Sequence, residues 1–349
     1  MTARSAPDAA AQPAAAQPEA VQPAAVPPLV LDLVGRARHI LILTHHNPDG
    51  DALGSARALA LTLRAAGRRA ALAPTGTLDQ HLSFLLDGLS VIDFPNDFSA
   101  YDLVALLDCD SLARLERNEL SLPAGGPPLV AIDHHPLRGE EKLEAGWFLE
   151  PSASSTGELV WRLLSALNLC PPPEAREALL AAIASDTGFF SQSNTTAAAL
   201  RAVADLVEMS GGGLLEKVHR RLREELPLRR LKLKGLALDS LRLHCDGRLA
   251  LMAVTPATLE AAGAVMADTE DLVELGRSLA GVTLSALIKD HGAGRLRVSL
   301  RSREPVNASA LAGLFGGGGH RLAAAYHDNL AATAEEAAAN LLARAENFL

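Results

Sequence analysis

The sequence has 349 residues, of which 48% are apolar and 21% are charged, a composition typical of a globular protein with room for two domains. Its formal net charge of −9 at pH 7 argues against a protein that coats long nucleic acid through a broad basic surface. Aromatic residues make up only 3% of the chain, so stacking on single-stranded nucleic acid can involve few rings.

The cysteines and the hydropathy pattern bear on the cellular compartment. Cys109, Cys170 and Cys245 are widely spaced and form no CxxC pair, which predicts free thiols rather than a zinc ribbon or a disulfide framework. No run reaches the roughly 18 apolar residues that a membrane span needs, and the N-terminal segment lacks the apolar core of a signal peptide. We therefore expect a cytoplasmic protein without a membrane partner.

Residues 1–28 are dominated by Ala, Pro and Gln. Such a segment cannot bury enough apolar area to offset the entropy lost on ordering, so we expect a disordered arm that takes no part in chemistry.

The next part of the chain has the pattern of an α/β domain, which we place at residues 29–212. Short apolar runs predict buried strands at residues 38–43, 70–73, 103–107 and 129–132. Helical spacing predicts helices at residues 52–66, 157–167, 174–185 and 196–209. Strands that are apolar on both faces and alternate with helices indicate a parallel sheet.

A second, smaller α/β domain is expected at residues 236–349, after a linker helix at residues 213–235. Three glycines at 211–213 predict a hinge, and we interpret the basic stretch at 219–223 as a solvated helix face. Strands are predicted at residues 249–254, 282–288 and 296–301. Helices are predicted at residues 271–280, 308–314 and 333–348.

The segment after the first strand carries candidate metal ligands. In open α/β sheets, ligands bind at the carboxyl ends of the strands. There, His45, Asp49 and Asp51 offer three donor atoms from one turn. Imidazole with carboxylates suits manganese, magnesium or zinc, while the lack of Cys ligands argues against a structural zinc site. Alone, the motif is equally well explained as a turn with an Asp that caps the following helix.

Other acidic residues and histidines follow the neighbouring elements. Asp108 and Asp110 follow the predicted strand at 103–107, Asp133-His134-His135 follows the one at 129–132, and Asp186 ends a helix. Carboxylates that converge on one sheet edge would repel one another without cations between them. We therefore expect two divalent ions, an arrangement that clamps phosphoryl oxygens and activates a bridging water.

At these residues the sequence resembles a known family. The motifs HHNPDGDALGS, LLDCDS, AIDHH and IASDTG resemble those of the DHH phosphoesterase superfamily, named for the triplet Asp133-His134-His135. Residues 298–303 and 315–320 resemble its DHHA1 module, and the resemblance runs from about Leu29 onward. It implies an N-terminal DHH catalytic domain with a parallel sheet and flanking helices, and a smaller C-terminal α/β DHHA1 domain with a mixed sheet.

The resemblance implies a role for each candidate residue. One metal ion would be held by His45, Asp49 and Asp108. The other would be held by Asp51, Asp108, His134 and Asp186, with Asp108 bridging. The expected catalytic residues are His135, which faces the substrate phosphate, Asp108, and Asp133, which orients its neighbours. Of the His45-His46 pair, His45 is favoured over His46 as the ligand, and Asp110, which has no metal role in the family, is a candidate for supporting a ligand or capping a turn.

The resemblance also implies substrate-binding residues in the second domain. These are Arg301, Gly316, Gly317, Gly318, Gly319 and His320. The glycine run, placed before an Ala-rich segment expected to be helical, would let backbone N–H groups approach an anion, although a flexible connector would have the same composition. Arg301 would grip a phosphate bidentately. Residues 323–325 read Ala-Ala-Ala where the family commonly has Ala-Ala-Gly, and residues 154–158 suit either a family segment near the site or a helix N-cap.

Within the superfamily, the two-domain organisation resembles the oligoribonuclease and 3′-phosphoadenosine 5′-phosphate (PAP) phosphatase group. This implies hydrolysis of short oligoribonucleotides to mononucleotides and of PAP to AMP, with two divalent ions, manganese first and magnesium as the alternative. A soluble phosphodiesterase for cyclic di-AMP or pApA is the second hypothesis, and a non-catalytic nucleotide sensor is the third. The expected partners are short RNAs or small phosphorylated nucleotides, not long duplexes, and a homodimer is left open.

Overall fold

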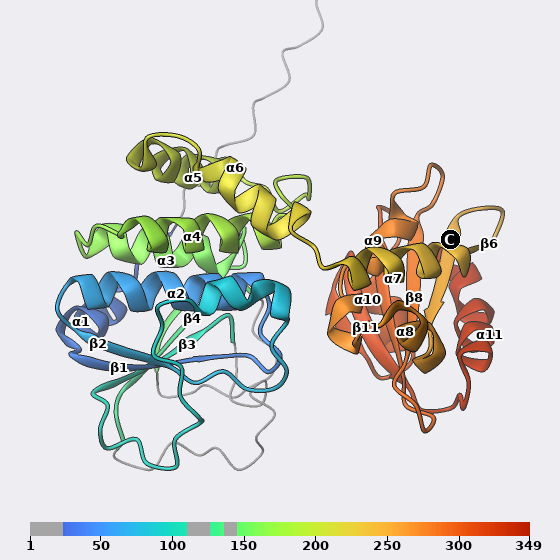
Figure 1. The fold of residues 1–349 in the computed structure, drawn as a ribbon, viewed down its shortest axis with the longest axis horizontal. Coiled ribbons are helices and arrows are strands. Elements are labelled where there is room, and N and C mark those ends of the chain that lie inside the picture. Colours follow the sequence, from blue (N-terminus) through green and yellow to red (C-terminus); the bar gives the residue numbers. More distant parts are fainter. Residues whose placement is uncertain (1–23, 110–125, 136–144) are drawn as a thin grey trace, which may run out of the picture.

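The computed structural model describes residues 24–109, 126–135 and 145–349, which form two bodies, each built on its own sheet (Figure 1). Most of the predicted disordered arm lies outside the described residues. Residues 24–28 of the arm are described and ordered: the Ala24 amide donates to the Glu150 carboxylate, and a helix begins at Pro28.

The first sheet is parallel throughout, with strand order β2-β1-β3-β4-β5. Its strands are β1 (His39–Thr44), β2 (Arg69–Leu72), β3 (Leu103–Leu107), β4 (Leu129–Asp133) and β5 (Ala145–Leu149). Both β3 and β4 are buried along their whole length, as a parallel sheet covered on both faces requires. The predicted strands are therefore confirmed, and β5 is an additional one.

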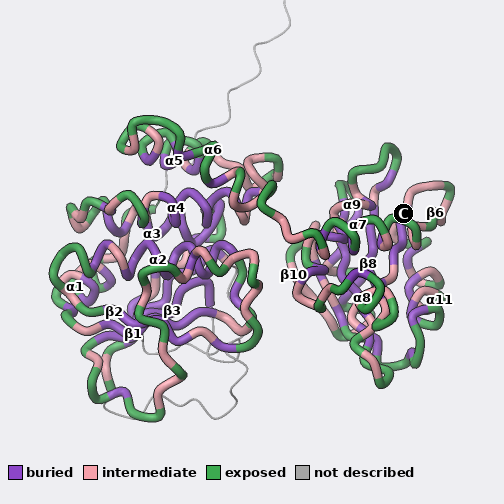
Figure 2. The backbone as a smooth tube through the Cα atoms, in the orientation of Figure 1, coloured by how far each residue is buried: buried purple, intermediate pink, exposed green. Residues whose placement is uncertain are grey.

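Helices cover this sheet in layers, with α2 nearest the strands and the later helices stacked beyond it (Figure 1). They are α1 (Pro28–Arg36), α2 (Gly50–Ala65), η1 (Gln80–Leu86), α3 (Thr156–Ala166), α4 (Pro173–Asp186), α5 (Ala197–Ser210), α6 (Leu214–His219) and η3 (Arg220–Glu224). A side chain at Gly54 of α2 would lie 2.7 Å from the Ala178 carbonyl of α4, so glycine permits this close helix packing. The layer of α3 and α4 is accordingly largely buried (Figure 2).

The second sheet is mixed, with order β10-β11-β9-β8-β7-β6, and only its β7–β8 pair is parallel. Its strands are β6 (Arg242–His244), β7 (Leu249–Val254), β8 (Leu284–Asp290), β9 (Leu296–Ser302), β10 (Gly318–His320) and β11 (Ala323–Asp328). The helices are α7 (Leu228–Asp239), α8 (Pro256–Ala262), η4 (Met266–Thr269), α9 (Leu272–Arg277), α10 (Ala308–Gly313), α11 (Ala334–Ala345) and η5 (Glu346–Phe348). The α/β class with one parallel and one mixed sheet is confirmed.

One expected element is wrong. The Ala-rich segment after the glycine run is not a helix but strand β11, which pairs with β9 on one side and β10 on the other. Ala324 and Tyr326 of this strand are buried, and the Tyr326 ring stacks on Phe315 at 4.1 Å. Pairing on both edges and burial of one face outweigh the helical preference of alanine.

No helix among the described residues is long and apolar enough to cross a membrane. Cys109, Cys170 and Cys245 are all free thiols.

Candidate functional site

The candidate ligands lie at the edge of the first sheet where parallel strands end. His45 follows β1, Asp108 follows β3, and Asp133 is the last residue of β4. Asp186 reaches the same edge as the last residue of α4. Parallel neighbours bring their carboxyl ends together, so residues far apart in the sequence become neighbours here.

The first group of donors is His45, Asp49 and Asp108. His45 Nε2 lies 3.4 Å from Asp108 Oδ2 and 3.9 Å from Asp49 Oδ1. Its Nδ1 lies 2.8 Å from the His46 carbonyl, a contact that fixes the proton on Nδ1 and leaves Nε2 to face the carboxylates. Asp49 also caps α2 by accepting from the amides of Asp51 and Ala52, so the two interpretations of this segment are compatible.

The second group of donors is Asp51, His134 and Asp186. His134 Nε2 lies 3.4 Å from Asp186 Oδ2 and 3.8 Å from Asp51 Oδ2. This nitrogen is buried and makes no hydrogen bond to any described residue. A buried nitrogen facing carboxylates at this spacing fits a divalent ion, whose ligands lie at about 2.0–2.2 Å.

Asp108 links the two groups, because it belongs to the first and to a third donor set, with Asp133, His134 and His135, which shares His134 with the second. Its Oδ2 faces His45, while its Oδ1 lies 3.8 Å from His134 Nε2. The backbone of Asp108 is left-handed, with φ of 54°, an uncommon conformation that is typical of functional sites. The two oxygens of this buried carboxylate are therefore divided between the two groups, which is the geometry that a bridging ligand needs.

The helix α3 holds Asp51 through its N-terminus. The amides of Thr156 and Gly157 donate to the Asp51 carboxylate at 2.7 and 2.9 Å, and Ser55 Oγ donates at 3.1 Å. A helix N-terminus stabilises a carboxylate in this position. Residues 154–158 thus form a helix N-cap and also lie at the site, because Ser155 caps α3 while Thr156 and Gly157 in the same turn contact Asp51.

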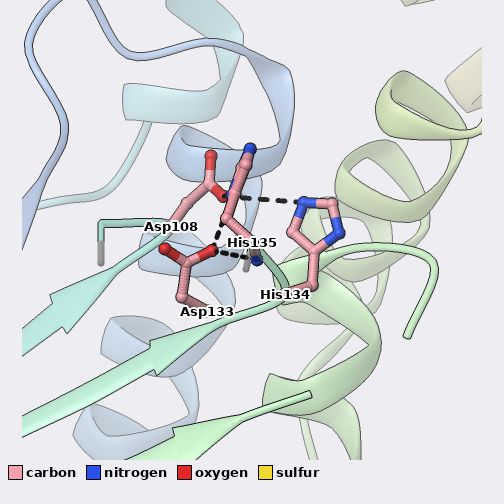
Figure 3. A group of neighbouring side chains, drawn as sticks. All are labelled: Asp108, Asp133, His134 and His135. Atoms are coloured by element: carbon pink, nitrogen blue, oxygen red, sulfur yellow. Dashed lines mark hydrogen bonds and ion pairs between the residues drawn. The ribbon is translucent and has the colours of Figure 1, made fainter. Parts of the chain in front are cut away.

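In the Asp133-His134-His135 triplet, the acid orients one of the histidines (Figure 3). Asp133 Oδ1 accepts from the His135 amide at 2.9 Å and lies 2.7 Å from His135 Nδ1. The same Nδ1 lies 3.3 Å from Asp108 Oδ1. Asp133 thus fixes the His135 ring beside the bridging carboxylate, while His134 points to the second group.

The charges of the site perturb its acid–base equilibria. Burial, and then the charges of Asp108 and Asp186, raise the pKa of Asp51 well above its usual range. Burial acts to lower the pKa of His45, but its contacts with Asp108 and Asp49 prevail and raise it to about 11. Burial likewise acts to lower the pKa of His135, but its contacts with Asp108 and Asp133 outweigh burial and raise this pKa to about 10. The cluster has an excess of negative charge that a cation would relieve.

Sequence reasoning missed Asn194. Its amide donates to the Asp186 carbonyl at 3.1 Å, to Asp186 Oδ2 at 3.4 Å and to the Ser154 carbonyl at 3.0 Å. This residue therefore ties the end of α4 to the turn before α3, a tertiary contact that no local pattern reports. Asp110 lies outside the described residues, and His46 belongs to none of the donor groups found among them.

The second domain brings His320 to the site. The His320 ring lies 4.8 Å from that of His135. Arg301, Ala323 and His320 are paired across β9, β11 and β10, so their side chains share one face of the sheet. On that face Arg301 Nε donates to Glu274 at 3.0 Å.

The glycine run has a structural requirement at two of its positions. A side chain at Gly317 would meet the Ala325 carbonyl at 2.3 Å, and one at Gly319 would meet the Ala323 carbonyl at 2.4 Å. Gly318 faces open space, and Gly316 has a left-handed backbone with φ of 74°. Close packing against β11 thus accounts for Gly317 and Gly319, while Gly318 remains available to a ligand.

Comparison with known proteins agrees with this geometry. Residues 39–185 match the family model described as DHH family, N-terminal domain, and residues 254–349 match the DHHA1 domain. The chain is also 32% identical over 288 residues to the bifunctional oligoribonuclease and PAP phosphatase NrnA of Thermus thermophilus, covering 80% of this chain and 81% of that one. The chain belongs to the DHH family.

Two further similarities extend over most of this DHH-family chain. The NrnA of Bacillus subtilis is 29% identical over 293 residues, covering 81% of this chain and 87% of its own. The crystal structure of an exopolyphosphatase-related protein from Bacteroides fragilis aligns with a TM-score of 0.80 at 23% identity. That alignment covers 91% of this chain and 96% of the other, and it supports the two-domain fold.

Proposed function

We propose that this protein is a metal-dependent phosphoesterase that hydrolyses short oligoribonucleotides to mononucleotides and PAP to AMP. The observation that carries the proposal is the pair of donor groups joined by Asp108 at the edge of the first sheet. The similarity to two proteins named as oligoribonuclease and PAP phosphatase, over about four-fifths of the chain, supports the choice of substrates.

The donor set suits two divalent ions, manganese first and magnesium as the alternative. Carboxylates and imidazoles without thiolates favour these ions over a structural zinc. His45, Asp49 and Asp108 would hold one ion, and Asp51, Asp108, His134 and Asp186 the other. When bound, the ions would supply charge to the phosphoryl oxygens and acidify water.

The chain's own residues would do the rest. Asp133 would keep the His135 ring facing the substrate phosphate, where a protonated imidazole stabilises charge or donates a proton to the leaving oxygen. Arg301, His320 and the N–H groups of Gly316–Gly319 would hold the substrate from the second domain. We place residues 29–212 in the catalytic domain and residues 236–349 in the substrate-binding domain, in a cytoplasmic protein.

A substrate panel tests the proposal. With manganese present, a diribonucleotide, PAP and cyclic di-AMP are incubated separately with the protein, and the products are separated by chromatography. We expect AMP from PAP and mononucleotides from the diribonucleotide, and a loss of kcat/KM of about a thousandfold in Asp108→Asn. Turnover of cyclic di-AMP alone would favour the second hypothesis, and turnover of none with intact metal binding would favour a sensor.

A further inference from the structure

A basic pocket lies where three parts of the chain meet, next to the candidate metal centre. Its volume is about 460 Å³, within the range of small-molecule sites. Gly188, Ser191 and Gln192 line it from the loop after α4, and Arg223 lines it from η3. The second domain supplies α9 and Arg303. Thus residues from both domains and from the connection between them form one concave surface.

The pocket adjoins the proposed chemistry from two directions. Gly188 follows the candidate ligand Asp186 by two residues, and Arg303 follows Arg301 by two, so each lies within about 7 Å of that neighbour along the backbone. Glu274, in the pocket lining, connects Arg301 to the pocket residue Arg277, because its oxygens accept from Arg301 at 3.0 Å and from Arg277 at 2.6 Å. The pocket therefore continues from the residue proposed to grip the substrate.

Its charge is unbalanced. Three arginines line the pocket against one carboxylate, Glu274, in a protein whose formal net charge is −9. The Arg277 side chain is paired with Glu274, while the guanidinium of Arg303 donates only to the Arg277 carbonyl among the described residues. Arg223 is exposed and has no ion pair with any described residue. Guanidinium groups without carboxylate partners in a concave site suit a phosphate, which they bind through paired hydrogen bonds.

The loop that lines the pocket on the side of the first domain has an unusual backbone. Gly188, Phe189 and Phe190 are all left-handed, with φ of 55°, 57° and 66°. Bulky residues rarely adopt this conformation, and it persists only where the surroundings enforce it. The Phe189 ring packs against the His219 ring at 4.8 Å, and Thr187 Oγ1 accepts from the Phe190 amide. This strained turn directs Ser191 and Gln192 into the lining of the pocket.

We propose that Arg223, Arg277 and Arg303 form a subsite for the substrate phosphate next along the chain from the one that is hydrolysed. The inference rests on the proposed function and deepens it, since it makes a second phosphate a determinant of substrate choice. None of the described residues that line the pocket is aromatic, so the subsite recognises phosphate rather than a stacked base.

The test compares substrates that differ by one phosphate. ApA has only the phosphate that is cleaved, whereas pApA and PAP each have two. In the double variant Arg223→Gln/Arg303→Gln, we expect the ratio of kcat/KM for pApA to kcat/KM for ApA to fall about tenfold to a hundredfold, because charge-assisted hydrogen bonds to the second phosphate are lost. The charge-matched control is Arg242→Gln/Arg295→Gln, which changes exposed arginines elsewhere on the second domain.

A ratio that stays within twofold, or an equal loss for ApA and pApA, would overturn the inference. Thermal unfolding shows that both double variants are folded. Equilibrium dialysis of labelled pApA and ApA gives a readout that does not depend on turnover, and the variant should lose its preference for pApA. A wild-type protein that binds pApA better than ApA but hydrolyses none of the three substrates would refute the proposed function and leave the subsite standing.

Discussion

The rings of His135 and His320 lie 4.8 Å apart at an angle of 33°, although one belongs to the Asp133-His134-His135 triplet and the other to strand β10 of the second domain. This contact joins the candidate metal centre to the proposed substrate-binding domain. Asp133 holds the His135 ring within the first domain. The distance between the two rings therefore depends on how the two domains are placed relative to each other.

Removing the His320 ring should lower activity without affecting the metals. We expect His320→Ala to reduce kcat/KM for a diribonucleotide by about tenfold to a hundredfold, because one positioned polar group is lost. Manganese affinity, measured by calorimetry, should stay within twofold, since His320 belongs to no donor group among the described residues. His327→Ala, an exposed histidine on β11, is the matched control. Unchanged kcat/KM in His320→Ala would contradict the proposed role.

Asp51→Asn should uncouple stability from manganese. Burial and the charges of Asp108 and Asp186 raise the pKa of Asp51, so the ionised Asp51 carboxylate destabilises the folded protein until a cation neutralises the cluster of carboxylates. The wild-type protein should gain about 2.7 kcal/mol of unfolding free energy at a metal concentration 100 times Kd. We expect the gain in Asp51→Asn to fall below about 1 kcal/mol at the same concentration.

Thermal or urea unfolding with manganese and with a chelator measures these gains. Asp32→Asn is the control, because Asp32 is an exposed acid whose ion pair with Arg36 lies on α1. It should keep the full gain. A gain in Asp51→Asn equal to that of the wild-type protein would show that Asp51 is not a ligand.

The sequence predicted the parts of the fold that depend on local pattern. Apolar runs placed β3 at its observed bounds and α2 within two residues of them, because burial on both faces and helical periodicity are visible in the sequence. Strand β11 was mistaken for a helix because alanine favours helices, and only its pairing with β9 and β10 makes it a strand. Strand β5 has a short sequence, AGWFL, with no alternation to reveal it.

The sequence predicted which candidate donors converge at the sheet edge, but not the hydrogen bonds that support them. His45, Asp108 and Asp186 could be named as candidates because each lies at the end of a recognisable element and within a family motif. The hydrogen bonds from Thr156 and Gly157 to Asp51 join residues more than 100 positions apart, and the contact between Asn194 and Asp186 is set by the end of a helix. These supports depend on tertiary packing, which the spacing of residues does not encode.

The glycine run permits a paired test of packing against function. Gly317→Ala should lower the unfolding free energy of the second domain by about 1–3 kcal/mol, because the new methyl would lie 2.3 Å from the Ala325 carbonyl. Gly318→Ala should leave stability within about 0.5 kcal/mol, since no atom lies within 4 Å of the added carbon. Urea unfolding measures both variants. Equal destabilisation of the two would show that the run is not required for packing against β11.

The joint between the domains should weaken in acid. Arg230 of α7 is buried and lies 3.4 Å from Asp79 in the first domain and 3.3 Å from Asp271 in the second. Burial acts to raise the pKa of Asp271, but the ammonium of Lys234 and then the charge of Arg230 outweigh it, so this pKa lies below its usual range. The stabilisation by Asp271 is therefore fully present above about pH 4, the pKa of an unfolded aspartate, and is lost as the pH falls through the lower folded value.

Asp271→Asn tests this dependence. We expect the variant to be less stable than the wild-type protein by about 1 kcal/mol at pH 7, a modest value because the Asp271 side chain is 32% exposed. The difference should stay constant above about pH 4 and shrink as the pH falls from there through the lower folded pKa, because the wild-type carboxyl becomes neutral there and its contribution disappears. Asp205→Asn, an exposed position on α5, is the control and should show no pH-dependent difference. A difference between Asp271→Asn and wild type that persists unchanged at pH 3 would mean that Asp271 stabilises the joint through hydrogen bonding rather than charge.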